Sequence, residues 1–217
     1  MDLRTRPPAS SFDVAVVGGG HAGLEAAAAA ARLGLRVVLI TLQEAALGRM
    51  SCNPAIGGIG KGQLVREVDA LGGCMGLLAD EAGIQFRLLN TRKGRAVQSP
   101  RCQCDRGAYE RAARRCMASP TGVRILEGEA VGFLRRSPRP DEERASLARG
   151  RRVCGLKLAD GGEVSARAVI LTTGTFLEGT LHTGLRQRPG GRVGERGVAW
   201  LGDALRELGL PTARLKT

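Results

Sequence analysis

The stretch FDVAVVGGGHAGLEAAAAAARLGLRVVLIT, residues 12–41, decides the fold. Residues 13–17 form a short apolar run that predicts a buried parallel strand, and glycine-rich residues 18–23 follow it directly. The alanine-rich segment 22–33 predicts a helix, and the apolar run 36–40 predicts a second strand. The stretch therefore predicts a βαβ unit, with a glycine turn where its first strand meets its helix.

Three glycines of this turn, Gly18, Gly20 and Gly23, match the G-x-G-x-x-G pattern of dinucleotide-binding folds. In that pattern the first glycine permits a tight turn, the second lets a pyrophosphate approach the backbone, and the third lets helix pack on strand. The N-terminus of the helix adds free N–H donors and a partial positive charge. The alternative is a glycine-rich turn with a purely structural role. The predicted cofactor-binding residues of the turn are Gly18, Gly19, Gly20, His21, Ala22 and Gly23.

One part of the fingerprint is missing. An acidic residue about 20 positions further on, at the end of the second strand, normally holds a ribose hydroxyl. Thr41 stands at that place, and Glu44 comes too late along the chain. Ribose recognition is therefore left without an assigned residue.

The composition favours a polyanionic partner. The chain has 217 residues, enough for one large domain or two small ones. Only 3% of them are aromatic within a hydrophobic share of 43%, so the core must be aliphatic. The formal net charge of +12 favours RNA, DNA or acidic membrane surfaces, and the alternative is a compositional bias toward arginine.

The cysteines and the termini favour a reducing compartment. The six cysteines have no paired zinc-ligand spacing, so we predict no metal site. No secretory signal begins the chain, and no run reaches the roughly 18 apolar residues of a membrane helix. We therefore expect reduced thiols in a cytosol-like compartment, with no membrane association.

The middle of the chain predicts mixed structure. A glycine-dense loop over 48–62 contains Gly-Lys but does not match a phosphate-binding P-loop. An amphipathic helix is expected over 63–71, a half-buried strand over 84–89, and a basic loop over 90–101. A further helix, capped by Asp105, is expected to run to about residue 117.

The last part of the chain predicts an antiparallel meander over about 123–171, with a charged hairpin tip at 137–150. The apolar last strand of the meander, 163–171, is expected to rejoin the parallel sheet. A long loop from Thr175 then leads to a helix over 198–208.

The segment SCNPAIGGIGKG, residues 51–62, is far more specific than the glycine fingerprint. Together with VREVDALGG, AGIQFRLLN, VILTTGTFL and RLKT, it makes nearly the whole chain resemble the N-terminal portion of the MnmG/GidA family. These are flavoproteins that modify C5 of the wobble uridine in certain tRNAs. The resemblance implies a glutathione-reductase-like Rossmann FAD-binding domain over 1–217, with a central parallel sheet and an antiparallel meander.

The resemblance also implies site residues. The adenosine diphosphate part of FAD is expected on the glycine turn, with Val131 and Gly174 as further FAD contacts. A serine that contacts FAD in relatives falls at Pro189, which removes a side-chain donor. Cys52 matches a functional family cysteine, and it is expected to act as a nucleophile or proton donor. The alternative for Cys52 is simple packing under the flavin.

The family reaction implies the partners. NADH reduces FAD, a folate-derived one-carbon unit is transferred to U34, and a GTPase of the MnmE type assists a homodimeric flavoprotein in the cytoplasm, or in the mitochondrion of a eukaryote. Family proteins continue into a nicotinamide-binding domain and a C-terminal helical domain, so this chain is expected to be a fragment or truncation that is inactive alone. The alternatives are a generic nicotinamide or flavin oxidoreductase domain and a non-catalytic dinucleotide-binding remnant.

Two smaller features are open to two interpretations. The basic loop residues Arg92, Lys93, Arg95 and Arg101 either meet an RNA backbone or form a solvated surface. Cysteines 102 and 104, in a stretch that usually lacks cysteine in the family, are either a redox pair or incidental thiols.

Overall fold

A computed structural model describes residues 11–51, 53–118, 122–137, 152–192, 194, 197–198 and 200–215. Cys52, most of the expected hairpin tip at 137–150, and residues 195–196 lie outside the described residues. Within the described part, no helix has both the length and the apolar character needed to cross a membrane.

The expected βαβ unit is present. Strand β1 (Phe12–Val17) leads into helix α1 (His21–Arg32) and then into strand β2 (Val37–Thr41). The two strands pair in parallel, with Val16 opposite Leu39. Gly34 has a φ of +78° just after the helix, the left-handed conformation that glycine adopts readily at a helix end.

Two more strands extend the parallel part of the main sheet. Strand β6 (Val123–Glu127) pairs in parallel with β2, and strand β9 (Glu163–Leu171) pairs in parallel with β1. Strands β7 (Ala130–Arg136) and β8 (Arg152–Leu158) then continue the sheet in antiparallel fashion, giving the order β6-β2-β1-β9-β8-β7. The antiparallel excursion therefore begins at Ala130 and not at residue 123, because β6 belongs to the parallel edge.

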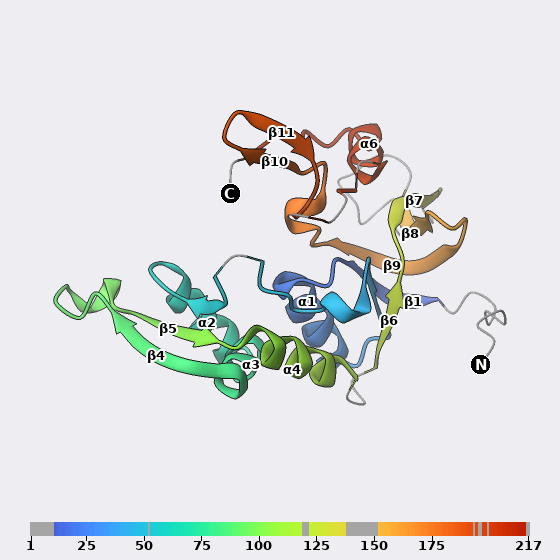
Figure 1. Cartoon of the computed structure of the whole chain (residues 1–217). Coiled ribbons are helices and arrows are strands. Elements are labelled where there is room, and N and C mark those ends of the chain that lie inside the picture. Colours follow the sequence, from blue (N-terminus) through green and yellow to red (C-terminus); the bar gives the residue numbers. More distant parts are fainter. Residues whose placement is uncertain are drawn as a thin grey trace.

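Both faces of the sheet are covered, which explains why its central strands are apolar throughout. One face packs against α1, α3 (Met75–Ala82) and α4 (Arg106–Ala118), and receives Val14 and Val16 of β1. The other face, which receives Ala15 and Val17, packs against β7, β8 and helix α6 (Trp200–Glu207). Figure 1 shows the C-terminal elements and α1 on opposite sides of the sheet.

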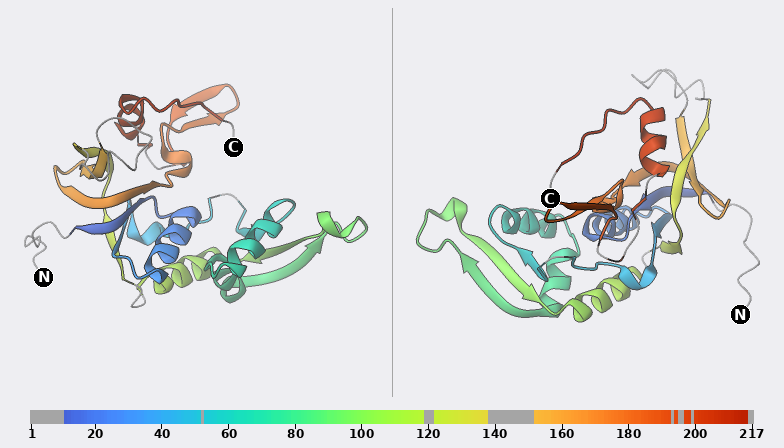
Figure 2. Two further views of the ribbon diagram at one scale, coloured as in Figure 1. Left: turned by 180° about the vertical axis from the view of Figure 1, so that it is seen from behind. Right: turned by 45° about the horizontal axis from the view of Figure 1, so that its top comes forward.

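A second sheet forms an arm that points away from the main sheet (Figures 1 and 2). Its antiparallel order is β3-β5-β4, and helix α2 lies beside it. The 3-10 turn η2 lies at the tip of the arm, between β4 and β5. The bounds of these elements are β3 Ala55–Gly57, α2 Lys61–Ala70, β4 Gly83–Leu89, η2 Arg95–Val97 and β5 Ser99–Cys104.

The arm corrects two expectations about burial. Helix α2 forms almost where it was expected, but Leu64 is 58% exposed and Leu71 is 84% exposed. Strand β4 also forms, yet its alternating apolar side chains Ile84, Phe86 and Leu88 are all more than half exposed. In the arm, the apolar periodicity is correct as an indicator of helix and strand and only partly correct as an indicator of burial, since Val65 of α2 packs against the core. The expected basic loop over 90–101 is shorter, because Ser99 already begins β5.

The C-terminal region contains a hairpin where one long loop was expected. The 3-10 turn η3 (Gly174–Phe176) follows β9, and strands β10 (Thr180–Thr183) and β11 (Arg186–Pro189) then pair in antiparallel fashion. The remaining 3-10 turn, η1 (Glu44–Ala46), follows β2. The expected cap of α4 is confirmed, since the N–H of Ala108 donates to Oδ1 of Asp105 at 2.6 Å.

Candidate functional site

The candidate site is a cavity of about 350 Å³ at the carboxyl ends of β1, β2 and β9, the place where parallel sheets bind ligands. Its size is within the usual range for a small-molecule site. Among the described residues that line it, the side chains that carry a permanent charge are those of Arg49 and Arg192, and none is a carboxylate. The cavity is therefore suited to an anionic ligand, with the charge of Arg49 partly offset by Glu110, whose Oε1 lies 3.3 Å from Nε of Arg49. The lining residues from the glycine turn and the start of α1 are Gly18, Gly19, Gly20, His21 and Ala22.

The three fingerprint glycines have three different surroundings. Gly18 has a φ of +110°, and a Cβ there would overlap the carbonyl oxygen of Thr172. A Cβ on Gly23 would overlap the carbonyl oxygen of Gly18, so this glycine permits the close approach of α1 to the turn. A Cβ on Gly20, by contrast, would meet nothing within 4 Å. This open space on the cavity side is what the approach of a pyrophosphate requires.

The N-terminus of α1 leaves backbone donors available to a ligand. Gly20 is the N-cap residue, and it provides no side chain to accept the N–H groups of the first turn. The helix has 12 residues, and its first turn carries no acidic side chain that would repel an anion. Its N-terminal end can thus hold a phosphate group by hydrogen bonds and by the helix dipole.

Thr172, which follows β9, is tied to the turn. Its hydroxyl donates to the carbonyl oxygen of Val17 at 2.8 Å and lies 3.1 Å from that of Gly18. The next residues, Thr173 to Phe176, line the cavity with Gly174 among them, and Gly174 has a φ of +56°. The threonine-rich segment thus forms a wall of the cavity next to the glycine turn.

The imidazole of His21 packs against Tyr109. Its Nδ1 lies 3.5 Å from the hydroxyl of Tyr109, and the two rings meet edge to face at 5.5 Å. Burial, together with the positive charge of Arg192, lowers the pKa of His21 below its ordinary value. The imidazole is therefore neutral near pH 7 and offers a hydrogen bond to a ligand rather than a charge.

The end of β2 confirms the departure from the ribose fingerprint. Thr41 is buried, and its hydroxyl donates to the backbone oxygen of Gln43 at 3.3 Å. The N–H of Glu44 donates to Oε2 of Glu127 at 2.9 Å, and neither glutamate lines the cavity. Gln43 does line it.

Of three further residues that the family resemblance singled out, two do not line this cavity and the third is not described. Val131 does not line this cavity; its neighbour Ala130 does, and Val131 faces a separate hollow beside Trp200. Pro189 ends β11, is exposed, and is not among the lining residues. Cys52 lies outside the described residues, while its neighbour Ser51 lines the cavity.

Four of the five described cysteines form two close pairs, and Cys154 belongs to neither. The sulfur atoms of Cys102 and Cys104 are 3.6 Å apart and buried, and burial raises the pKa of Cys102 to about 12. This favours incidental protonated thiols over a redox pair. A hydrogen bond between Cys74 and Cys116 raises the pKa of Cys74 and lowers that of Cys116. No sequence pattern indicates this second pair, since Cys74, just before α3, and Cys116 in α4 are far apart in the chain.

The basic residues of the arm lie apart from the cavity. Arg92, Lys93 and Arg95 are exposed at the β4–β5 tip, Arg101 is half-buried in β5, and none lines the cavity. Their role as RNA contacts stays a prediction.

Comparisons with known proteins show which family the chain resembles over its length. The sequence profile of the family described as Glucose inhibited division protein A matches residues 13–217. The tRNA uridine 5-carboxymethylaminomethyl modification enzyme MnmG of Granulibacter bethesdensis is 47% identical over 217 residues, covering 100% of this chain and 33% of the relative. The chain thus spans about a third of the length of this relative.

Two solved structures share the fold. That of Aquifex aeolicus GidA has a TM-score of 0.81 and 44% identity, and covers 93% of this chain and 31% of the other. PqsL of Pseudomonas aeruginosa, described as a probable FAD-dependent monooxygenase, has a TM-score of 0.50 and 18% identity over 74% of this chain and 42% of the other. The second likeness concerns the α/β fold alone. The chain, by contrast, matches its family profile over nearly its whole length, and it belongs to the glucose-inhibited division protein A, or MnmG/GidA, family.

Proposed function

We propose that this chain is the FAD-binding part of a flavoprotein that modifies C5 of the wobble uridine, U34, in tRNA. The supporting observation is a cavity suited to an anion, with the glycine turn along one wall, in a chain 47% identical along its whole length to an MnmG enzyme. Since the chain spans about a third of that relative, the activity belongs to a longer protein, and the chain alone is expected to be inactive.

The residues of the cavity have distinct roles in this proposal. The turn from Gly18 to Ala22 and the N-terminus of α1 would hold the pyrophosphate of FAD, with Arg49 and Arg192 supplying positive charge. The end of β2 would hold the adenosine side, with Gln43 as its polar side chain. FAD, when bound, would take a hydride from NADH and supply the redox chemistry for transfer of the folate-derived one-carbon unit.

A generic nicotinamide dehydrogenase domain is the second candidate. Such a domain ordinarily places a carboxylate at the end of β2 to bind the ribose. The described residues that line this cavity include no carboxylate, and that disfavours the second candidate.

Cys52 is the proposed reactive residue. Formation of a bond at C5 of a uridine is assisted by a nucleophile that adds to C6, and a thiolate is suited to that step. The glycine-rich setting with Lys61 nearby in the sequence would favour the thiolate form. The cavity-lining position of Ser51 is consistent with a reactive residue next to it in the chain.

The partners follow from the family. We propose tRNA as substrate, a GTPase of the MnmE type as partner, and a homodimer as the working assembly. The site of action would be the cytoplasm, or the mitochondrion of a eukaryote. Basic residues of the arm tip would add contacts to the RNA backbone that depend strongly on salt.

The Cys52→Ser variant tests the function. In cells that lack their own enzyme, the longest polypeptide that this gene encodes is expected to restore the modified U34. Cys52→Ser is expected to reduce it at least roughly a hundredfold, because the serine hydroxyl is a far weaker nucleophile than a thiolate. Mass analysis of tRNA nucleosides provides the measurement, with flavin content determined on the same purified variant.

Cys154→Ser is the matched control, since Cys154 is half-buried in β8 and does not line the cavity. A normal level of modified U34 with Cys52→Ser would contradict the reactive role of Cys52 and favour simple packing. Failure of the parent polypeptide to restore any modified uridine would contradict the proposed function itself.

A further inference from the structure

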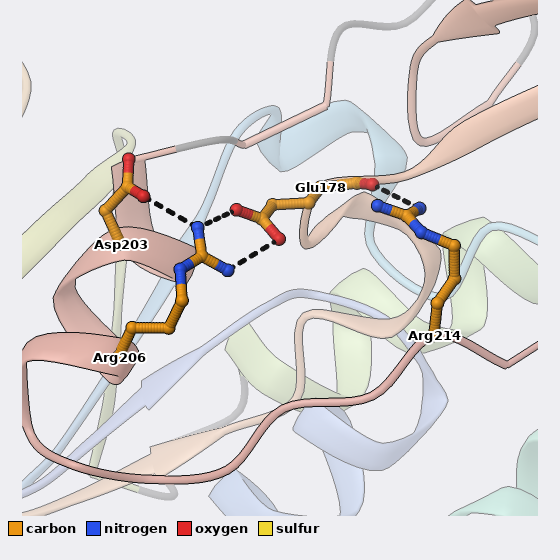
Figure 3. A network of polar contacts seen from close by, with 4 residues as sticks. All are labelled: Glu178, Asp203, Arg206 and Arg214. Atoms are coloured by element: carbon orange, nitrogen blue, oxygen red, sulfur yellow. Dashed lines mark hydrogen bonds and ion pairs between the residues drawn. The ribbon is translucent and has the colours of Figure 1, made fainter.

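A network of charged side chains joins the cavity wall to the C-terminal part of the chain (Figure 3). Both carboxylate oxygens of Glu178 face the guanidinium of Arg206, with one contact at 3.0 Å and a second, shorter one. The same guanidinium donates to Asp203 at 2.6 Å. Arg214 donates to the backbone oxygen of Glu178 at 2.9 Å and to the hydroxyl of Thr180 at 3.1 Å.

Glu178 follows the cavity wall directly. The wall ends at Phe176, and the N–H of Glu178 donates to the carbonyl oxygen of Val198 at 3.0 Å. The N–H of Val198 in turn donates to the oxygen of Phe176 at 2.7 Å, and Val198 lines the cavity. Movement at Glu178 would therefore be transmitted to two lining residues.

The backbone at Glu178 is strained. Its φ is +50°, in the left-handed region that non-glycine residues rarely adopt. Strained backbone of this kind persists where surrounding interactions hold it, and it is concentrated at functional sites. The contacts of Arg206 and Arg214, together with the hydrogen bond from the N–H of Glu178 to Val198, hold it here.

Helix α6 is shaped to receive the Glu178 side chain. A Cβ on Gly202 would lie within 2.8 Å of Cγ of Glu178, so glycine at this position leaves the space that the side chain occupies. Leu201, the preceding residue of α6, lines the cavity. The ion pair between Glu178 and Arg206 thus connects the cavity wall that follows β9 with helix α6, which also lines the cavity.

We propose that Glu178 is a positioning residue for the cofactor cavity: its ion pair with Arg206 holds the wall of residues 172–176 and helix α6 at the separation that FAD binding requires. This inference rests on the proposed function, because it assumes that the cavity binds FAD. Glu178 does not line the cavity and makes no contact with the cofactor in this account.

The expected loss of FAD affinity depends on how exposed the side chains of Glu178 and Arg206 are to solvent. Hydrogen bonding to Arg206 holds the pKa of Glu178 below its ordinary value, so the carboxylate is charged at neutral pH. The side chains of Glu178 and Arg206 are 30% and 45% exposed, and solvent-accessible ion pairs are individually weak. The two parallel contacts between the Glu178 carboxylate and the Arg206 guanidinium make this pair stronger than a pair with a single contact. We expect loss of the pair to weaken FAD binding roughly five- to tenfold.

The experiment uses the longest polypeptide that the gene encodes, with FAD affinity measured by flavin fluorescence and apoprotein stability by urea unfolding. Glu178→Gln removes the charge, and Glu178→Gly also relieves the backbone strain. Glu178→Arg and Arg206→Glu are tested singly and together. The matched control is Glu81→Arg, whose partner Arg115 forms an exposed ion pair between α3 and α4, away from the cavity.

The proposal expects Glu178→Gln and Glu178→Gly to weaken FAD binding similarly, and both single charge reversals to weaken it further. The double reversal is expected to regain part of the affinity, because Asp203 would still face the new carboxylate at position 206, while Glu81→Arg leaves the affinity unchanged. Unaltered FAD affinity in Glu178→Gln, normal affinity in Glu178→Gly, or no recovery in the double reversal would overturn the positioning role. Absence of FAD binding by the parent would instead contradict the proposed function.

Discussion

Gly20→Leu is expected to abolish FAD binding while leaving the fold intact. The backbone of Gly20, with φ −78° and ψ −174°, is extended and can be adopted by any residue. Its Cβ would meet nothing within 4 Å, so the fold has room for the side chain. That room is the space by which a pyrophosphate reaches the turn. We expect the affinity for FAD to fall at least roughly a hundredfold, or about 2.7 kcal/mol.

Flavin absorbance after purification and a fluorescence titration measure this loss. Gly94→Leu is the matched control, because a Cβ at Gly94 also meets nothing within 4 Å and this residue lies near the tip of the arm. Normal flavin stoichiometry in Gly20→Leu would show that the phosphates do not approach this glycine.

Gly23→Ala is expected to destabilise the protein strongly. The added methyl group would overlap the carbonyl oxygen of Gly18, and backbone atoms cannot move aside as the end of a flexible side chain can. The start of α1 would have to shift away from the turn. We expect a loss of about 3 kcal/mol in the free energy of unfolding, or failure to fold. Urea unfolding measures it.

Gly107→Ala in α4 provides the comparison. The nearest atom to its Cβ is the end of the Arg111 side chain, at 3.0 Å, which can move. Alanine favours a helix over glycine by about 1 kcal/mol, so Gly107→Ala should stabilise the protein. Equal changes in the free energy of unfolding for the two variants would mean that the overlap with Gly18 does not determine the effect of Gly23→Ala.

The central βαβ unit could be predicted because its signals are local. Apolar runs at 13–17 and 36–40, with an alanine-rich helix between them, gave strands and a helix close to the observed bounds. The role of β6 could not be predicted in the same way. Its sequence, VRILE, suits either a meander strand or a parallel edge strand, and only its pairing with β2 distinguishes them.

The arm and the C-terminal hairpin show where sequence patterns stop being informative. Ile84, Phe86 and Leu88 alternate as in a half-buried strand, but burial depends on what lies opposite, which periodicity does not contain. Strand β11, with the sequence RQRP, is fully exposed and lacks an apolar pattern, so it was expected as part of a loop.

Some residues of the candidate site could be predicted from local sequence, and others are brought to it only by the fold. The glycine turn could be predicted, since its G-x-G-x-x-G spacing lies within one short stretch of the chain. The carbonyl oxygen of Thr172, which constrains Gly18, comes from a distant segment. Arg192, Val198 and Leu201 reach the cavity from distant parts of the chain, and no local spacing indicates them. The network around Glu178 was missed for the same reason, because its partners Arg206 and Arg214 are brought to it by the fold.

The most direct test of the account is a titration of the longest polypeptide of this gene with FAD, followed by competition with ADP. We predict one FAD per chain, and displacement by ADP at concentrations at which AMP, which lacks the pyrophosphate, has little effect. FAD that does not bind, or bound FAD that ADP fails to displace, would contradict the claim that the turn at residues 18–23 holds the pyrophosphate of FAD.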